Sequence, residues 1–319
     1  MPDARVLAIM RERMLTYIAR RLALTVPVLF GVVTLVFALI HLVPGDPAQA
    51  MLGESAPPAD LVELRARLGL DQPLGVQYER YLVGVLHGDL GTSFRYGTPV
   101  SREIAARVGR TAELAVVAMV FAVLFAVPLG VIGALYQGKW VDEVATGVSL
   151  AGIAMPNFWL GPVLAIVFAV QLGWLPVSGT GSWRHFVLPA VTLGAALAAM
   201  TARITRASVI EELRELYVLA ARARGLSASR AVVRHALRNS LIPVVTVLGL
   251  QLGSVLTGTI ITETIFSWPG VGRLLIQAIN FRDYPLVQGC ILLIATTYVL
   301  MNLAVDVVYA WLDPRIRYS

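Results

Sequence analysis

The uncharged stretch LAVVAMVFAVLFAVPLGVIGALY occupies Leu114–Tyr136 and decides the class of fold. A helix that crosses the roughly 30 Å hydrocarbon core of a bilayer needs about 20 residues, and this stretch is long enough. In the whole 319-residue sequence 57% of residues are hydrophobic and 14% are charged. Because soluble domains average about 25% charged residues, we expect an all-α membrane protein.

Five further apolar runs satisfy the same length requirement, which predicts about six transmembrane helices. They are Leu22–Val43, Val144–Trp183, Phe186–Ala202, Leu241–Thr262 and Pro285–Val305. The run Val144–Trp183 is long enough for two passes, but Pro156, Pro162 and Pro176 indicate one kinked helix with irregular ends. The run Phe186–Ala202 is rich in Ala and Gly, which predicts a helix inside a bundle.

Basic residues predict the orientation, because cytoplasmic segments carry an excess of Lys and Arg. With six spans and cytoplasmic N- and C-termini, 16 basic residues lie inside and 10 outside. Eight arginines fall in 203–240, and a seventh span would place them outside. The predicted order is a cytoplasmic segment 1–21, a first span 22–43, an extracytoplasmic loop 44–113, a transmembrane core 114–312 and a cytoplasmic tail 313–319. The loop is expected to contain short helices around Ala59–Leu68 and Val76–Leu86.

The sequence excludes several kinds of chemistry. The net charge of +6 comes from arginines at the ends of apolar runs, a topology pattern and not a nucleic-acid surface. There is no G-x-x-x-x-G-K-[ST] phosphate loop, and the four histidines and Cys290 have no metal-ligand spacing. The spans are almost free of charge, since Glu263 and Asp306 lie at helix ends that water or a partner can reach. An ion-coupled transporter needs a midplane charge, so energy is expected from another chain.

The segment 203–240 is predicted to form a helix, a glycine turn and a second helix outside the membrane. Residues 211–224 are amphipathic. Their apolar stripe consists of Leu213, Leu216, Tyr217, Ala220 and Ala221. Arg222 and Arg224 fill the last turn, and Gly225 follows where a left-handed C-cap is expected. A simple tether required only by topology is the alternative.

This segment resembles the E-A-A-x-x-x-G loop of ABC importer permeases, with Leu219 in place of Glu and Gly225 at the final position. His235-Ala236-Leu237-Arg238 and the following Asn239-Ser240-Leu241-Ile242-Pro243 resemble the dipeptide/oligopeptide/nickel branch of that family. In the family this loop is the coupling helix that docks into a groove of the ATPase subunit. The resemblance therefore assigns ATPase coupling to Leu219, Ala220, Ala221, Arg222, Arg224 and Gly225.

The resemblance covers nearly the whole chain from about Met14. Its further motifs are Y-I-x-R-R-L (17–22), P-G-D-P (44–47), L-G-L-D-x-P (68–73), G-D-L-G-x-S (88–93), E-x-x-F-x-x-P-G-x-G (263–272) and R-D-Y-P-x-x-Q-G (282–289). Each motif is weak alone, but their number and order are specific. They imply a type I ABC importer permease bundle of about six transmembrane helices, the first of the two permease subunits.

A translocation path or gate is expected from two groups of residues. Gly249, Gly253 and Gly258 line the fifth span, which borders the path in the family, although close helix packing explains them equally. Glu263, Arg282 and Asp283 belong to the two closing motifs. The resemblance favours an external gate or docking surface there, in which Arg282 and Asp283 pair with each other or with a partner. An interfacial turn anchored by Trp268 and Tyr284 is the alternative.

Together these features imply a permease subunit of an ATP-driven ABC importer in a bacterial-type cytoplasmic (inner) membrane. Its expected partners are a second homologous permease, two ABC ATPase subunits that bind ATP, an extracytoplasmic solute-binding protein and the lipid bilayer. The chain itself is expected to bind no cofactor, metal or nucleic acid. The expected solute is a di- or oligopeptide or a similar small solute. The motifs do not identify it further, because peptide, glutathione, nickel and opine systems share them. A secondary ion-coupled transporter and a structural subunit of a membrane complex are the alternatives.

Cysteine labelling tests the predicted orientation. In a Cys290→Ala background, an impermeant thiol reagent should label Asp60→Cys in intact cells and should label Arg222→Cys only after permeabilisation. The expectation rests on the excess of basic residues in 203–240. Labelling of position 222 but not position 60 in intact cells would invert the topology.

Overall fold

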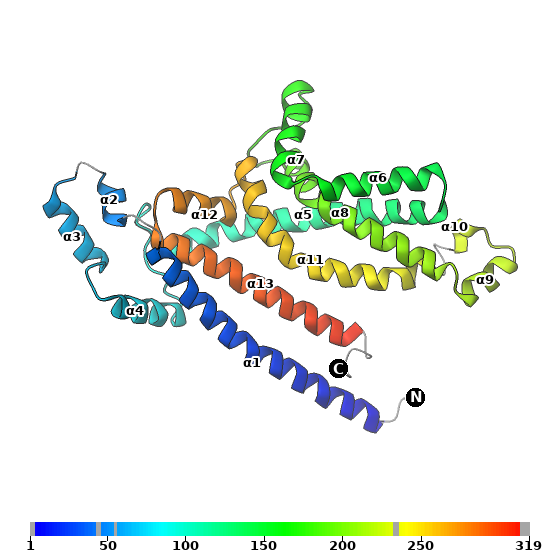
Figure 1. The fold of residues 1–319 in the computed structure, drawn as a ribbon, viewed down its shortest axis with the longest axis horizontal. Helices are drawn as coiled ribbons and strands as arrows, with labels where there is room; N and C mark the ends of the chain where they lie inside the picture. Colours follow the sequence, from blue (N-terminus) through cyan, green and yellow to red (C-terminus); the bar gives the residue numbers. More distant parts are fainter. Residues whose placement is uncertain (1–3, 43–45, 54–55, 232–235, 313–319) are drawn as a thin grey trace. The chain divides into compact units, whose positions relative to one another are not determined.

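The computed structural model describes residues 4–42, 46–53, 56–231 and 236–312 (Figure 1). Within these ranges the chain is helical and contains no strand, apart from an isolated bridge between Thr92 and Pro99. The chain divides into two compact units, one made of residues 1–109 and 270–319 and the other of residues 110–269. The expected all-α membrane fold is confirmed, although the division into two units was not predicted.

The first unit contains long helices at both ends of the chain and short ones between them. Its helices are α1 (Ala4–Leu42), α2 (Pro47–Leu52), α3 (Pro58–Leu68), α4 (Leu74–Leu86), the start of α5 (Val100–Leu135), α12 (Val271–Asn280) and α13 (Tyr284–Leu312). The two helices predicted around 59–68 and 76–86 are therefore present as α3 and α4. Helix α5 begins at Val100, inside the segment 44–113 that was expected to be a loop.

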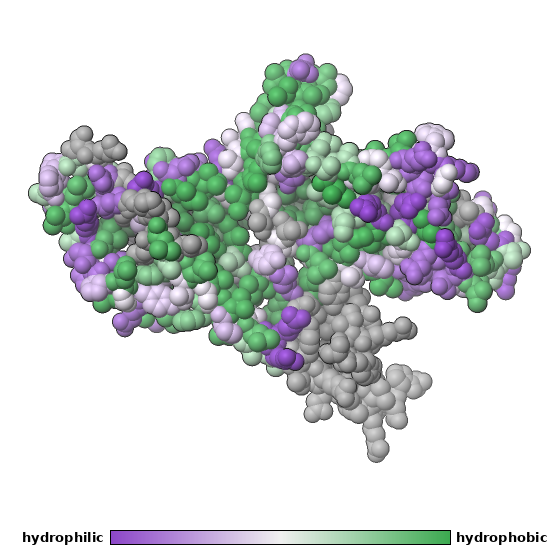
Figure 2. All heavy atoms as spheres, in the orientation of Figure 1, coloured by the Kyte–Doolittle hydropathy of each residue, from purple (hydrophilic) through white to green (hydrophobic). Residues whose placement is uncertain are grey.

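The second unit contains the remainder of α5 and the central helices. These are α6 (Trp140–Ala154), α7 (Asn157–Leu164), the π-helix η1 (Ala165–Gln171), α8 (Arg184–Glu212), α9 (Leu216–Ala223), α10 (Ala228–Ala231) and α11 (Leu237–Ile265). On the face shown in Figure 2, hydrophilic residues gather around α9 and the adjoining end of α6, whereas the visible surface of α7 is mostly hydrophobic.

Four single helices of the described chain are long and apolar enough to cross a membrane, and the number rises to five if one bent pair is counted as one span. The single spans are Ala19–Ala38, Val100–Leu135, Arg184–Glu212 and Tyr284–Val305. The predicted span Leu241–Thr262 lies within α11, some of whose side chains fall outside the described residues. In α8 56% of the apolar window is buried, against 11% in α1, so α8 lies inside a bundle as its small residues predict.

The run Val144–Trp183 is not the single kinked helix that was predicted. Helix α6 ends at Ala154, and the axis turns by 107° before α7 and η1 continue. Met155 at the break is extended, with ψ 114°, because the ring of Pro156 disfavours helical geometry in the residue before it. The proline effect was foreseen, but it breaks the helix where only a kink was expected.

Glycines allow the helices of the second unit to pack closely. A methyl group at Gly130 of α5 would lie 2.6 Å from both the Ala202 carbonyl oxygen and Thr205 Cβ of α8. A methyl group at Gly194 of α8 would in turn lie 2.8 Å from the carbonyl oxygen of Ala118. These crossings bring backbone against backbone, as small residues do in membrane bundles.

An ion pair fixes one end of this unit. Arg206 of α8 donates from Nε and Nη2 to the two carboxylate oxygens of Asp142 at 2.6 and 2.7 Å. Asp142 also accepts from the Gly138 backbone N–H at 3.0 Å, which ties down the turn between α5 and α6. The bidentate geometry is the strong form of this interaction. The same end of α8 leads directly into α9.

The close contact of α5 with α8 predicts that a methyl group added at this contact lowers the stability, whereas one added elsewhere does not. Gly130→Ala should lower the free energy of unfolding by about 1–3 kcal/mol, because backbone atoms block the new group. Gly147→Ala on α6 is the matched control, since nothing lies within 4 Å of its added Cβ. Melting temperatures in detergent compare the two, and equal stability of both variants would contradict the close crossing.

Candidate functional site

The coupling segment is built differently from the single helix predicted over 211–224. Helix α8 ends at Glu212, a turn follows, and α9 starts at Leu216 after Glu215, which is extended with ψ 142°. The break changes the rotational phase of the second half of the segment. Of the predicted stripe, Leu213 packs inward, but Leu216 is exposed and the buried residue of α9 is Val218, which lies outside the stripe.

The C-terminus of α9 has the geometry expected for glycine. Gly225 has φ 96°, its N–H donates to the Arg222 carbonyl at 2.9 Å, and the Leu226 N–H donates to the Ala221 carbonyl at 3.4 Å. This pair of bonds is a Schellman motif, which requires a left-handed residue at Gly225. Nothing lies within 4 Å of an added Cβ at this position. Glycine is therefore required by backbone conformation and not by space.

Helix α9 has one buried anchor and an exposed apolar face. Val218 is fully buried against Ala231 and Ala236, with Leu213 beside them. Leu216 is 81% exposed and Leu219 44% exposed. Of the other residues assigned to coupling, Ala220, Arg222, Arg224 and Gly225 are exposed and Ala221 is half-buried. Apolar side chains this exposed outside a span leave a face for a partner.

One tyrosine connects α9 to the two long helices beside it. The Tyr217 hydroxyl donates to the carboxylate of Glu212, the last residue of α8, and accepts from Asn239 Nδ2 at 3.0 Å. Asn239 lies in the first turn of α11. Helix α9 is thus bonded to the end of α8 and to the beginning of α11. The predicted stripe included Tyr217, but nothing in the sequence indicated this polar role.

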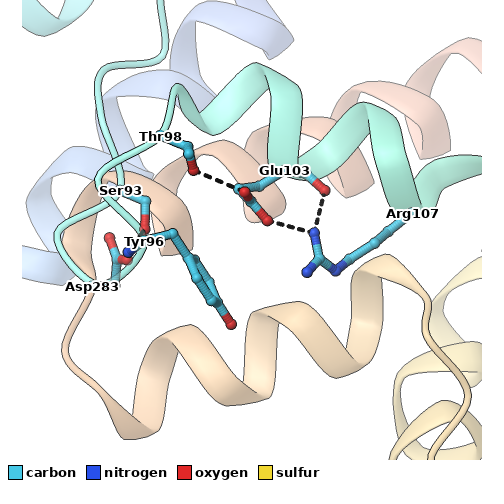
Figure 3. A network of polar contacts seen from close by, with 6 residues as sticks. All are labelled: Ser93, Tyr96, Thr98, Glu103, Arg107 and Asp283. Atoms are coloured by element: carbon cyan, nitrogen blue, oxygen red, sulfur yellow. Dashed lines mark hydrogen bonds and ion pairs between the residues drawn. The ribbon is translucent and has the colours of Figure 1, made fainter.

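In the first unit, Asp283 joins two motifs that are far apart in sequence. Its fully buried carboxylate accepts hydrogen bonds from the Ser93 hydroxyl and from the backbone N–H groups of Phe94 and Arg95, both at 3.1 Å (Figure 3). It also accepts from the Leu286 N–H at 3.3 Å, which caps the start of α13. The motifs at 88–93 and 282–289 therefore form one structure.

A second carboxylate continues this network. Thr98 Oγ1 donates to Glu103 at 2.8 Å, and Arg107 Nη1 donates to the other oxygen of the same carboxylate at 2.6 Å (Figure 3). Ser93 links the two halves, because its backbone N–H donates to the Thr98 carbonyl at 2.9 Å. The loop before α5 is therefore held from both sides.

The predicted role of Arg282 and Asp283 as a pair is corrected by this geometry. Among the described residues the ion pairs do not include one between them, and Arg282 is exposed with φ 53°. The buried carboxylate is committed to backbone N–H groups. Arg95 lies with its guanidinium 3.3 Å from the ring centroid of Phe281, which adds a second contact between the same segments.

Glu263 belongs to the second unit and is fully buried, so the expectation that water reaches it is wrong. Its carboxylate accepts from Thr111 Oγ1 at 2.7 Å. Trp268 is also fully buried, and its indole N–H donates to the Arg110 carbonyl at 2.9 Å. Phe186 packs edge-on against the Trp268 ring at 4.6 Å. Trp268 is thus a core residue and not a headgroup anchor.

The three glycines of the predicted path lie along α11. Gly253 is buried, and Gly249 and Gly258 are half-buried. A methyl group at Gly258 would approach Leu193 Cδ1 of α8 to 3.0 Å. The contact supports the packing interpretation of Gly258, whereas a role in a path stays a prediction.

Residues 126–318 match the family described as "Binding-protein-dependent transport system inner membrane component", and residues 14–115 match the N-terminal part of such membrane components. The chain is 46% identical over 306 residues to the glutathione transport system permease protein GsiC of Salmonella typhimurium strain LT2, covering 96% of this chain and 100% of the relative. It is 47% identical over 307 residues to GsiC of Escherichia coli strain K12, with the same coverage.

A solved structure, the crystal structure of an amino acid ABC transporter with histidines, matches with a TM-score of 0.51 at 18% identity. The match covers 67% of this chain and 94% of that one, and shows a shared fold. The chain belongs to the binding-protein-dependent inner membrane components, as an ABC importer permease of the peptide/nickel family. Such a permease is not itself an enzyme, and the ATPase lies in separate subunits.

The Asp283 network predicts a large loss of stability when its acceptor is removed. Asp283→Ala should destabilise the protein by about 3 kcal/mol or more, because several buried donors lose one charged acceptor. The measurement is the melting temperature, together with protease cleavage in the loop 93–99. Arg282→Asn is the control, since Asn tolerates a left-handed backbone and the side chain is exposed. Equal protease resistance in both variants would contradict the network.

Proposed function

We propose that this chain is one of two permease subunits of an importer for short peptides or peptide-like solutes, driven by ATP bound to two partner ATPases. Two of its relatives are named as glutathione transport permeases, and glutathione is a peptide. An extracytoplasmic solute-binding protein delivers the solute. The proposal for the solute rests on those relatives, since the chain is similar to them over their full length.

The observation that carries the coupling proposal is the exposed apolar face of α9. Leu216 and Leu219 extend outward from an element anchored by Val218. Such a face matches a groove on an ATPase subunit, as the motif at 219–225 implies. The neighbouring basic side chains Arg222 and Arg224 add positive charge around this contact.

Movement of α9 is proposed to reach the membrane helices through its two attachments. Only three residues separate α9 from α8, and Tyr217 bonds to both α8 and α11. Helices α8 and α11 pack extensively on each other. A displacement of α9 by the ATPase would therefore shift these helices together. Gly249, Gly253, Gly258 and Glu263 on α11 are placed by this proposal on the moving element that borders the path or gate.

The proposed orientation places α9 and both termini in the cytoplasm. The segment 44–113 and the loop held by Asp283 then lie on the opposite side, where the solute-binding protein docks. The supporting feature is the excess of arginine in 203–240. In this arrangement Arg282, which is exposed, is available to a docked partner, whereas Asp283 shapes the surface beside it.

The coupling proposal predicts opposite effects of two substitutions at one position. Gly225→Val should abolish most solute uptake, because a β-branched residue at φ 96° costs on the order of 1–3 kcal/mol of strain. Gly225→Asn should retain uptake, because Asn tolerates a left-handed conformation. Since space around the position is open, any defect in the valine variant comes from conformation. Uptake and ATP hydrolysis are measured with the assembled complex in proteoliposomes.

Ala221→Glu tests the docking face by placing a charge beside it. We expect the variant to insert and to assemble with the second permease, while the ATPases dissociate or hydrolyse ATP without moving solute. Copurification and the ratio of ATP hydrolysed to solute imported distinguish these outcomes. Normal uptake by both Gly225→Val and Ala221→Glu at wild-type expression would show that 203–240 is only a tether.

A further inference from the structure

A pocket of about 250 Å³ lies within the first unit, away from every residue assigned to coupling or gating except for the neighbourhood of Asp283. Three of the family-like motifs contribute to its wall, namely those at 68–73, 88–93 and 282–289. Most of the wall is apolar, including Phe37, Leu70 and Phe94. The proposed transport cycle assigns no ligand to the pocket that these motifs form. Their convergence on one pocket requires a separate explanation.

The pocket lies at the level where membrane spans end. Phe37 is one residue from the end of the candidate span Ala19–Ala38, and Tyr284 is the first residue of the span Tyr284–Val305. Helix α4 closes the pocket from the side, with Tyr81 stacked on Phe37 at 5.8 Å between ring centroids. Lipid headgroups occupy this level of a bilayer, and tyrosine is enriched there. The occupant is therefore expected to have both a polar and an apolar part.

Two polar groups of α4 belong to residues that line the pocket and have no partner among the described residues. The Tyr81 hydroxyl is buried and makes no hydrogen bond. Burial raises the pKa of Tyr81 to about 12, so the hydroxyl keeps its proton and can donate. Buried hydroxyls are nearly always bonded, which indicates a missing acceptor.

Arg80 is the second such group. The neighbouring Arg65 and Arg67 pair with Asp46 and Glu63, but no ion pair includes Arg80 in the described chain. Its guanidinium lies against the left-handed turn at Gly69, where an added Cβ would be 2.7 Å from Nη1. A guanidinium fits the oxygens of a phosphate in a bidentate manner.

Asp89 supplies the opposite charge on the same wall. Its Oδ1 accepts from the Gly91 N–H at 2.9 Å, and the side chain remains exposed. A wall with one cation and one anion suits a zwitterion. Exposed apolar side chains on α1 and α4, two of the helices that line the pocket, provide a surface for hydrocarbon chains, among them Leu42 and Leu86.

We propose that this pocket binds a phospholipid with a zwitterionic headgroup, whose phosphate contacts Arg80 and Tyr81 and whose ammonium contacts Asp89. A free peptide carries the same pair of charges. The bilayer level of the pocket and its apolar wall favour the lipid over the peptide. The inference does not depend on the solute of the importer or on the coupling role of α9.

Native mass spectrometry of the delipidated full-length chain tests the proposal with phosphatidylethanolamine and phosphatidylglycerol as probes. For the tightest-bound lipid, Arg80→Gln should weaken phosphatidylethanolamine binding about tenfold, and Tyr81→Phe should weaken it several-fold. Asp89→Asn should remove the preference for phosphatidylethanolamine over phosphatidylglycerol while phosphate binding remains. Arg67→Gln is the matched control, because that exposed arginine is already paired with Glu63.

Three results would overturn the assignment. The first is unchanged lipid binding in both Arg80→Gln and Tyr81→Phe. The Tyr81→Phe variant is expected to fold, because it keeps the ring contact with Phe37. The second is a loss of lipid binding in Arg67→Gln equal to that in Arg80→Gln, which would show that binding depends on total positive charge and not on this pocket. The third is displacement of the lipid by millimolar alanyl-alanine in the wild type but not in Arg80→Gln, which would make a free peptide the occupant.

Discussion

A chain that crosses a bilayer has to satisfy its own backbone hydrogen bonds, because hydrocarbon supplies neither donors nor acceptors. This constraint explains the helical character of the described chain and the way each interruption is treated. The break after Met155 is followed by Pro156, which has no N–H to leave unpaired. At the end of α9 the N–H groups of Gly225 and Leu226 donate to the carbonyls of Arg222 and Ala221, which would otherwise lack a partner in the helix. Asp283 accepts the N–H groups of a loop and of a helix start together.

Features carried by local pattern were predictable from the sequence. Apolar length placed four of the six predicted spans, proline and glycine bounded α3 and α4, and Gly225 marked a left-handed cap that the structure contains. The phase of α9 was not predictable, because the three residues between α8 and α9 rotate the helix so that Val218 faces inward. A single periodicity over 211–224 cannot represent such a break. A short turn that interrupts a helical pattern is invisible to that pattern.

Contacts between distant segments were also beyond the sequence. Glu263 was expected where water or a partner can reach it, and Asp283 at an external gate or docking surface, but both carboxylates are fully buried. A carboxylate is buried when donors converge on it, and those donors come from Thr111 in one case and from residues 93–95 in the other. The motifs at 88–93 and 282–289 were recognised separately. Only the fold shows that the Asp283 carboxylate both caps the start of α13 and holds the loop at 93–95.

The first unit is discontinuous, whereas the second is a single stretch of chain from 110 to 269. Domains generally fold as units while synthesis proceeds from the N-terminus. The stretch that carries α9 can therefore be complete while the ribosome has not yet delivered Asp283, which follows Ser93 by 190 residues. The loop at 93–95 has to wait for that carboxylate. In the order of biogenesis, the unit that carries α9 can fold before the loop at 93–95 receives the carboxylate that holds it.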